Sequence, residues 1–213
     1  PNMTVEKIVK LAEYYRKNGA DVIDIGCLPN QHFGHLAETI QELKRREFYV
    51  SVDSHSDKEL ILGGKSGADY LLSIKSDNFH ILDEVDSYPI LIPKDGDMES
   101  LYECIDKCLA NKRVFIADPI LDPIHYGFTE SILRYSQLRK KYPDIHIMMG
   151  TGNLTELTHA DTTGITMVLM GIISELKINH ILTTQVSMHC SSVIKENDLA
   201  RRIILASSIN NTT

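Results

Sequence analysis

The segment Gly-Ala-Asp-Val-Ile-Asp-Ile-Gly at residues 19–26 opens with a glycine and continues as a short apolar strand. Residues 67–71, Gly-Ala-Asp-Tyr-Leu, repeat this arrangement. Glycine commonly follows the last turn of a helix. Short strands that are apolar on both faces are typical of parallel sheets covered by helices. The two segments therefore predict a repeated unit in which a helix stops and a buried strand follows directly.

The alternation of helix and strand continues along all 213 residues. Apolar side chains at helical spacing predict helices over residues 4–18, 34–46, 57–66, 98–110, 129–141, 163–176 and 198–207. Short apolar runs bounded by polar turns predict seven strands, at residues 21–26, 48–53, 69–74, 89–93, 113–118, 145–150 and 180–186. The chain is therefore expected to be an α/β protein with a parallel sheet.

Two architectures fit this pattern, an open doubly wound sheet and a TIM (β/α)8 barrel. Polar residues lie at or near the carboxyl ends of different predicted strands, where a barrel forms one mouth: Asp24, Asp53, Asp118, Thr151 and Gln185. An open sheet usually has Gly-x-Gly-x-x-Gly after its first strand, whereas this chain has Gly-Cys-Leu-Pro-Asn-Gln at residues 26–31. We predict one barrel domain over residues 1–213. Because a barrel needs eight strands, we expect the first strand to be missing and the chain to be a fragment lacking its N-terminal part.

The formal net charge of −7 argues against general attraction to nucleic acid or to anionic membranes. The longest apolar run, residues 165–173, is too short to span a bilayer. The four cysteines form no Cys-x-x-Cys pair, so packing roles are favoured over metal or disulfide roles. With no visible secretory leader, a cytoplasmic protein is expected.

Asp53, Asp118 and Asp24 form the sharpest candidate site. A carboxylate can accept two hydrogen bonds from an amidine-like ring edge, such as that of a guanine or a pterin. The alternative is that each aspartate caps the following helix. Ser56 and Asp57 are better placed to cap the helix after Asp53, and Pro119 follows Asp118 directly, so ligand roles are favoured for those two. Asp24 is expected to support the site.

A second candidate cluster is an anion site at Thr151, Gly152 and Asn153, joined by Gln185 and Ser187 after the last strand. Glycines at a strand end let backbone N–H groups face an anion. A tight turn and a solvated loop are the alternatives. No metal site is predicted, because His32 and His35 lack further ligands.

Several motifs resemble a known family. Residues 19–26, 50–54 (Val-Ser-Val-Asp-Ser), 67–73 and 117–120 (Ala-Asp-Pro-Ile) resemble the pterin-binding barrels, dihydropteroate synthase above all. A second set of segments resembles the dihydropteroate synthase-like proteins linked to tetrahydromethanopterin biosynthesis: residues 149–157, 160–165, 182–186 and 198–202. The resemblance covers essentially the whole chain.

By this resemblance, Asp53 and Asp118 would hold the pterin ring and Asp24 would support them. Either Ser73 or Lys75 would correspond to the synthase's asparagine. A synthase has a lysine where this chain has residues 151–154, and an Arg-x-His pair where it has Gln185 and Ser187. These differences remove cations that would bind diphosphate or a carboxylate, and so argue against ordinary dihydropteroate synthesis.

The implied reaction is that of a transferase in folate- or methanopterin-type cofactor biosynthesis. It joins a pterin-methyl diphosphate to an arylamine and releases diphosphate, with Mg²⁺ as the expected cofactor. One alternative is methyl transfer from a methylated pterin to a corrinoid protein, and another is a pterin-binding module without catalysis. A homodimer is possible by analogy with dimeric synthases.

Overall fold

The computed structural model describes residues 3–29 and 31–212. Contacts within the chain group it into two compact units, Pro1–Ile116 and Ala117–Thr213, whose boundary falls inside strand β5 (Ile116–Ala117). We describe each unit separately. The expectation that residues 1–213 form one domain stays a prediction.

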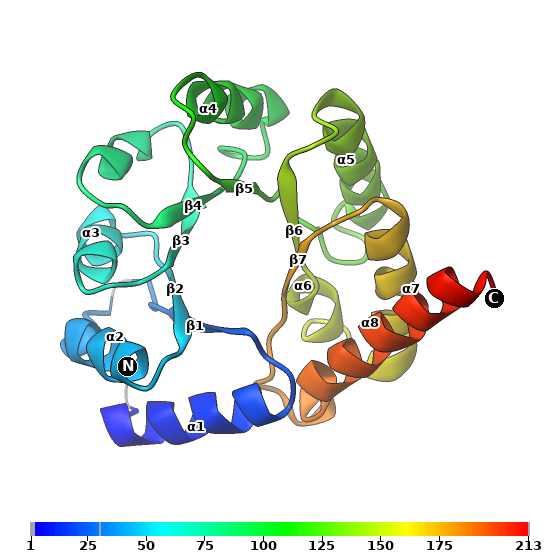
Figure 1. The fold of residues 1–213 in the computed structure, drawn as a ribbon, viewed down its shortest axis with the longest axis horizontal. Coiled ribbons are helices and arrows are strands. Elements are labelled where there is room, and N and C mark those ends of the chain that lie inside the picture. Colours follow the sequence, from blue (N-terminus) through cyan, green and yellow to red (C-terminus); the bar gives the residue numbers. More distant parts are fainter. Residues whose placement is uncertain (1–2, 30, 213) are drawn as a thin grey trace. The chain divides into compact units, whose positions relative to one another are not determined.

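In the first unit, strands β1 to β4 are neighbours in chain order and run parallel. Helices α2, α3 and α4 lie along one side of these strands (Figure 1). The elements of this unit are α1 (Val5–Lys17), β1 (Val22–Gly26), α2 (Leu36–Arg45), β2 (Tyr49–Asp53), α3 (Asp57–Lys65), β3 (Tyr70–Ile74), the 3₁₀ helix η1 (Phe79–Asp83), β4 (Tyr88–Leu91) and α4 (Met98–Ala110).

The two repeated segments adopt the predicted local structure. Gly19 follows helix α1 with φ 108° and Gly67 follows helix α3 with φ 101°. Glycine reaches this left-handed region without steric cost, so each helix can stop abruptly and lead into a strand. At the other end of α1, the side chain of Thr4 caps the helix by accepting a hydrogen bond from the Lys7 amide.

The core of the first unit lies between the strands and their helices. Helix α2 contributes Leu36, Ile40 and Leu43, all with no exposed surface, and strand β2 contributes Val50 and Val52, which are equally buried. The burial of neighbouring residues 50–52 along β2 fits a strand covered on both faces.

Two glycines in helix α3 allow a close approach to neighbouring elements. A Cβ atom on Gly63 would lie 3.0 Å from the Val52 side chain, and one on Gly64 would lie 2.7 Å from Val85. The segment Gly64-Lys65-Ser66 therefore ends a packed helix. It is not the start of a phosphate-binding helix.

In the second unit, strands β6 (His146–Gly150) and β7 (His180–Leu182) pair in parallel. Helices α7 and α8 pack against each other. The remaining elements and these helices are α5 (Phe128–Lys141), α6 (Gly152–Thr155), α7 (Thr162–Glu175), the 3₁₀ helix η2 (Met188–Cys190) and α8 (Val193–Asn210).

The final helix starts earlier than predicted, at Val193 rather than at residue 198, and continues to Asn210. Val193, Ile194 and Asn197 are buried, so packing extends the helix toward its N-terminus. The prediction placed its start at the acidic residue Asp198, which instead pairs with two arginines inside the helix.

Two strands are shorter than predicted. The predicted strand at residues 113–118 is reduced to β5, and the Arg113 side chain before it donates to the backbone carbonyls of Leu82 and Val85. The predicted strand at residues 180–186 ends at Leu182, so Gln185 lies in the loop that follows β7.

All four cysteines are buried, which fits the packing interpretation. Burial raises the pKa of the Cys27 and Cys190 thiols to about 12, so they stay protonated and weakly reactive. Among the helices of residues 3–29 and 31–212, none combines the length and apolar character that crossing a bilayer requires.

Candidate functional site

Asp118 directly follows strand β5 and is 6% exposed. Its Oδ1 atom accepts two hydrogen bonds, one from the Ile120 amide at 2.8 Å and one from the Tyr135 hydroxyl at 2.6 Å. Its Oδ2 atom receives no hydrogen bond from any residue that the structure describes. The nearest glycine, Gly150 of β6, would place a Cβ atom 3.8 Å from Oδ2. One carboxylate oxygen is therefore held by the protein, whereas the other makes no hydrogen bond to the described residues.

Burial dominates the electrostatics of Asp118. Desolvation raises the pKa of this carboxyl group from 3.8 to about 6. The Tyr135 hydroxyl, the Ile120 amide and the charge of Arg134 act in the opposite direction. Asp118 is therefore mostly ionised at neutral pH and takes up a proton in mildly acidic solution.

The loop that carries Asp118 is strained and braced. Ile120 has φ 65°, which is costly for a β-branched residue and requires support from its surroundings. Arg134 of helix α5 supplies this support by donating to the carbonyls of Pro119 at 3.2 Å and Ile120 at 2.8 Å. The same guanidinium group contacts Asp122 at 2.7 Å. Helix α5 therefore fixes the loop that positions the carboxylate.

Asp53 is the last residue of strand β2, and its Oδ1 accepts a hydrogen bond from the Ser73 hydroxyl at 2.7 Å. Ser73 lies in β3 with φ 65°, where the pairing between β3 and β4 shifts register. The strained backbone of Ser73 therefore accompanies a side-chain contact with Asp53. As in Asp118, one oxygen of Asp53 is held by a hydroxyl group.

Asp24 lies in the middle of strand β1, opposite Ser51 in β2. The Ser51 hydroxyl donates to Asp24 Oδ1 at 2.6 Å. Asp24 keeps exposed surface in β1, but neighbouring atoms desolvate part of its carboxyl group and raise its pKa. The Ser51 hydrogen bond opposes this shift, and the nearby charge of Asp53 adds to it. Asp24 and Asp53 therefore interact electrostatically within the first unit.

Ser73 and Lys75 are placed differently. Ser73 contacts Asp53, whereas the Lys75 ammonium group lies 3.9 Å from Asp77. The Lys75 amide donates to Asn78 Oδ1 at 2.8 Å, and the Asn78 side chain donates back to the Ser73 carbonyl at 3.2 Å. Asn78 therefore holds the turn after β3, a role that the sequence analysis missed.

Several hydrogen-bond donors of the candidate anion cluster already donate to carbonyl oxygens of the protein. The Thr151 amide and hydroxyl both donate to the Leu182 carbonyl, at 2.8 and 3.2 Å. The Asn153 side chain donates to the Leu121 carbonyl at 2.8 Å. Gly152 is a point of close packing, because a Cβ atom there would lie 2.6 Å from the Thr184 hydroxyl.

The loop after β7 contains a carboxylate of its own. The Ser187 amide donates to Glu156 Oε1 at 2.6 Å, and Gln185 Oε1 accepts from the Ile194 amide at 3.3 Å. Hydrogen bonds from residue 187 and its neighbours outweigh desolvation and lower the pKa of Glu156. An anion at Ser187 would have to compete with this carboxylate, and anion binding here stays a prediction.

Tyr135 is the most informative residue that the sequence analysis missed. It lies on the buried face of helix α5 with Ser131 and Leu138. A buried tyrosine hydroxyl usually requires a polar partner. The spacing of residues 131, 135 and 138 marked this face as buried, but the partner, 17 residues away at Asp118, was not visible in the sequence.

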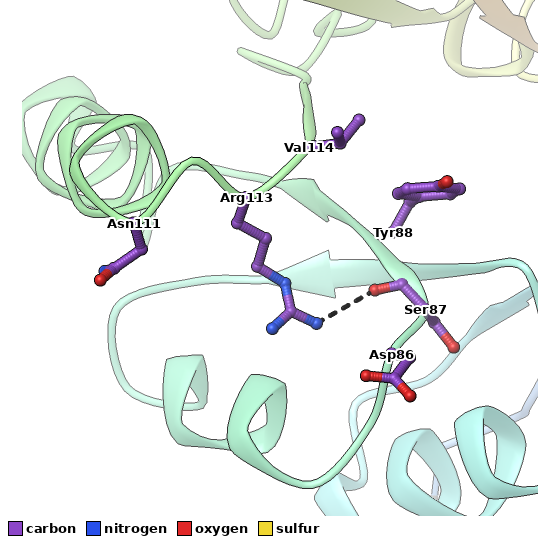
Figure 2. A pocket seen from close by; sticks show the side chains of 6 residues that line it. All are labelled: Asp86, Ser87, Tyr88, Asn111, Arg113 and Val114. Carbon is purple, nitrogen blue, oxygen red and sulfur yellow. Dashed lines mark hydrogen bonds between the residues drawn. The ribbon is translucent and has the colours of Figure 1, made fainter.

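A surface cavity lies within the first unit, at the amino end of strand β4 (Figure 2). Arg113 reaches into it and donates to the Ser87 carbonyl at 3.3 Å. Because the same guanidinium group also binds two other backbone carbonyls, it serves to brace the chain. The cavity is lined by Asp86, Ser87, Tyr88, Asn111, Arg113 and Val114, none of which belongs to the predicted site.

Within the described parts of the chain, no three His, Cys, Asp or Glu side chains come together in an arrangement suited to a metal ion. These residues therefore do not supply an all-protein site for the expected Mg²⁺.

Comparisons with known proteins identify the fold. No protein-family model matches the chain. An uncharacterized protein of Methanocaldococcus jannaschii is 30% identical over 231 residues. The alignment covers 97% of this chain and 42% of that protein, so the chain spans less than half the length of this relative.

Three solved dihydropteroate synthases are similar in structure. The Coxiella burnetii enzyme in complex with pteroic acid has a TM-score of 0.74 at 16% identity, covering 97% of this chain and 87% of that one. The Yersinia pestis enzyme with a sulfonamide drug has a TM-score of 0.72 at 15% identity, covering 97% of this chain and 87% of that one. The Xanthomonas albilineans enzyme has a TM-score of 0.71 at 14% identity, covering 98% of this chain and 89% of that one. The chain thus has the α/β-barrel fold of the dihydropteroate synthases, with seven strands in the part that the structure describes.

Proposed function

We propose that this chain is a dihydropteroate synthase-like protein that binds a pterin through Asp118. The observation that carries the proposal is a buried carboxylate with one oxygen held by two hydrogen bonds and the other without a hydrogen-bond partner among the described residues. The amino-pyrimidine edge of a pterin presents N–H donors, and a charged acceptor forms the stronger bonds with them. The complex of the Coxiella burnetii enzyme with pteroic acid supports the choice of ring.

Asp53 is proposed as the second carboxylate that binds the pterin, with Ser73 orienting it and Asp24 supporting it. The support for this role is the contact between Asp53 and Ser73 and the strained backbone of Ser73. Lys75 keeps a proposed role in binding the ligand, although its ammonium group faces Asp77.

The proposed reaction joins a pterin-methyl diphosphate to an arylamine and releases diphosphate, in folate- or tetrahydromethanopterin-type biosynthesis. Asp118 and Asp53 would orient the pterin so that its methylene carbon faces the amine. The proposed anion-binding residues, which would receive the diphosphate, are Thr151, Gly152, Asn153, Gln185 and Ser187. Mg²⁺, a cytoplasmic location and a homodimer remain expectations.

A second candidate function is pterin binding without catalysis. It is favoured by the state of the anion cluster, where Thr151 and Ser187 donate to protein oxygens and Glu156 brings a negative charge. A diphosphate leaving group needs stabilisation by donors or cations. Methyl transfer to a corrinoid protein is the third possibility and is decided by the same set of assays.

Calorimetry with a panel of pterins, with and without Mg²⁺, tests the binding step. We expect the wild-type chain to bind a pterin and the Asp118→Asn variant to bind at least tenfold more weakly, because the amide places an N–H donor or a neutral acceptor where the ligand needs an anion. Asp86→Asn, at the cavity of Figure 2, is the matched control and should bind as the wild type does. Equal binding by Asp118→Asn and the wild type would show that the site is wrong.

Turnover assays then separate the three functions. Diphosphate release from a pterin-methyl diphosphate in the presence of an arylamine identifies the synthase-like reaction. Methyl transfer that requires a corrinoid protein identifies the methyltransferase. Pterin binding with neither reaction identifies the binding module.

A further inference from the structure

Tyr135 connects helix α5 to the carboxylate at the centre of the proposed site. Its side chain has no exposed surface, and its hydroxyl lies 2.6 Å from Asp118 Oδ1. Burial and the charge of Asp118 raise the pKa of Tyr135 well above its ordinary value, so the hydroxyl stays protonated and acts as a donor.

The two hydrogen bonds on Oδ1 determine what Asp118 can offer. A carboxylate oxygen has two lone pairs, and those of Oδ1 are used by Tyr135 and by the Ile120 amide. Rotation of the carboxyl group would break both bonds. Oδ2 is therefore the one oxygen that Asp118 can offer to a ligand, and its direction is fixed. Both N–H groups of a ring edge would have to donate to this single oxygen.

We propose that Tyr135 is a positioning residue for ligand recognition: it holds Oδ1 of Asp118 so that Oδ2 alone, as an anion, meets the N–H donors of a pterin ring. This inference rests on the proposed function and extends it to a residue that does not touch the ligand. It follows from a contact between residues 17 positions apart in the chain.

The charged and titratable groups around Asp118 determine how the proposal can be tested. Helix α5 supplies Tyr135 and Arg134, and Arg134 is itself paired with Asp122. Three contacts favour the ionised form of Asp118 and so lower its pKa. The hydrogen bond from Tyr135 has the largest effect, followed by that from the Ile120 amide and by the charge of Arg134. Removal of this hydroxyl should therefore let Asp118 take up its proton at a higher pH.

The test compares Tyr135→Phe, which keeps the buried ring, with Tyr126→Phe, whose tyrosine is 82% exposed. Binding of 6-hydroxymethylpterin is measured by calorimetry between pH 5 and pH 7.5. We expect wild-type affinity to fall as the pH drops through about 6. In Tyr135→Phe this midpoint should move up by about one pH unit, with affinity at pH 7.5 reduced roughly two- to tenfold. Tyr126→Phe should match the wild type.

A measurement without ligand keeps this inference separate from the proposed function. In protein labelled with ¹³C-aspartate, the Asp118 carboxyl resonance is identified by its loss in Asp118→Asn and then titrated. Its midpoint should rise in Tyr135→Phe and stay unchanged in Tyr126→Phe. Circular dichroism confirms that each variant is folded.

The outcomes separate the two proposals. Suppose that pterin binds the wild type, but Tyr135→Phe leaves the midpoints of pterin binding and of the Asp118 titration unchanged, or weakens binding equally at every pH. Tyr135 is then only structural, and the inference is overturned. If the carboxyl midpoint moves but the wild type binds no pterin, the proposed function fails, whereas the control of Asp118 by Tyr135 is supported.

Discussion

At the scale of single residues, three aspartates share one arrangement. In Asp24, Asp53 and Asp118, the Oδ1 atom accepts a hydrogen bond from a hydroxyl group, supplied by Ser51, Ser73 and Tyr135 respectively. Each hydroxyl restricts the rotation of the carboxyl group and leaves the other oxygen oriented. Such preorganisation is what a binding site needs, because the cost of ordering the side chain is met during folding.

The raised pKa of Asp118 predicts a pH-dependent loss of stability. The folded protein binds this proton with a pKa of about 6, against 3.8 for the ordinary group. The folded state therefore holds the proton more tightly than the unfolded chain, and the contribution of Asp118 to stability falls as the pH rises between these values. Asparagine stays neutral throughout. The free energy of unfolding of Asp118→Asn, relative to the wild type, should increase by about 2 to 3 kcal/mol from pH 4 to pH 7.

Urea denaturation of both proteins at pH 4, 5, 6 and 7 measures this difference. The prediction concerns its change with pH, so any constant effect of the new amide cancels. A difference that stays flat or decreases across this range would contradict the raised pKa of the carboxyl group.

Two glycines provide a matched test of close packing. At Gly152 an added Cβ would lie 2.6 Å from the Thr184 hydroxyl and 3.1 Å from its backbone nitrogen, so Gly152→Ala should cost about 1 to 3 kcal/mol. At Gly171, inside helix α7, no atom lies within 4 Å of the added Cβ, so Gly171→Ala should stabilise by about 0.5 to 1 kcal/mol. Thermal unfolding of both variants measures the contrast. Equal destabilisation of the Gly152→Ala and Gly171→Ala variants would refute this prediction.

At the scale of the elements, Arg113 fastens the segment between helix α4 and strand β5 to the segment before β4. Its guanidinium group donates to the carbonyls of Leu82 and Val85, at 2.7 and 2.8 Å. It also donates to the Ser87 carbonyl at 3.3 Å (Figure 2). A lysine cannot reach three carbonyls in this fork geometry. Arg113→Lys should therefore lower the free energy of unfolding by about 1 to 3 kcal/mol.

The control for Arg113→Lys is Arg202→Lys, because Arg202 forms an exposed ion pair with Asp198 and its loss should change stability by less than about 0.5 kcal/mol. Pterin affinity should stay within about twofold of wild type in both variants. A large loss of affinity in Arg113→Lys would move the ligand site to the cavity of Figure 2.

The sequence predicted the elements well and their ends less well. Helix and strand type follow from local apolar spacing and from the glycines after α1 and α3, which act within a few residues. The start of α8 at Val193 depends instead on the packing of its first turn, and strands β5 and β7 are shorter than the local pattern predicts. No local pattern around residues 113–118 indicates that an arginine will bind carbonyls 26 to 31 residues away.

At the scale of the whole molecule, ligand binding should appear as added stability. A ligand that binds only the folded chain raises the free energy of unfolding by about 2.7 kcal/mol when its concentration is a hundred times Kd. We expect a pterin to raise the Tm of the wild type in proportion to the logarithm of its concentration. The same titration with the Asp53→Asn and Asp118→Asn double variant should show little or no shift.

The controls in this experiment are a purine that lacks the exocyclic amino group and the single variant Asp86→Asn. The purine should leave the Tm unchanged, and Asp86→Asn should respond to the pterin as the wild type does. An equal shift in the double variant would place pterin binding elsewhere on the chain.

The amino-acid sequence by itself determined the alternation of helices and parallel strands and the placement of aspartates at or near strand ends, because these depend on short-range spacing and on glycine conformation. The tertiary structure alone decided how those aspartates are used. It brought Ser73 rather than Lys75 to Asp53, across 20 residues, and Tyr135 to Asp118, across 17. Such contacts depend on the packing of whole elements, which sets the direction of each side chain and so decides which carboxylate oxygen is left for a ligand.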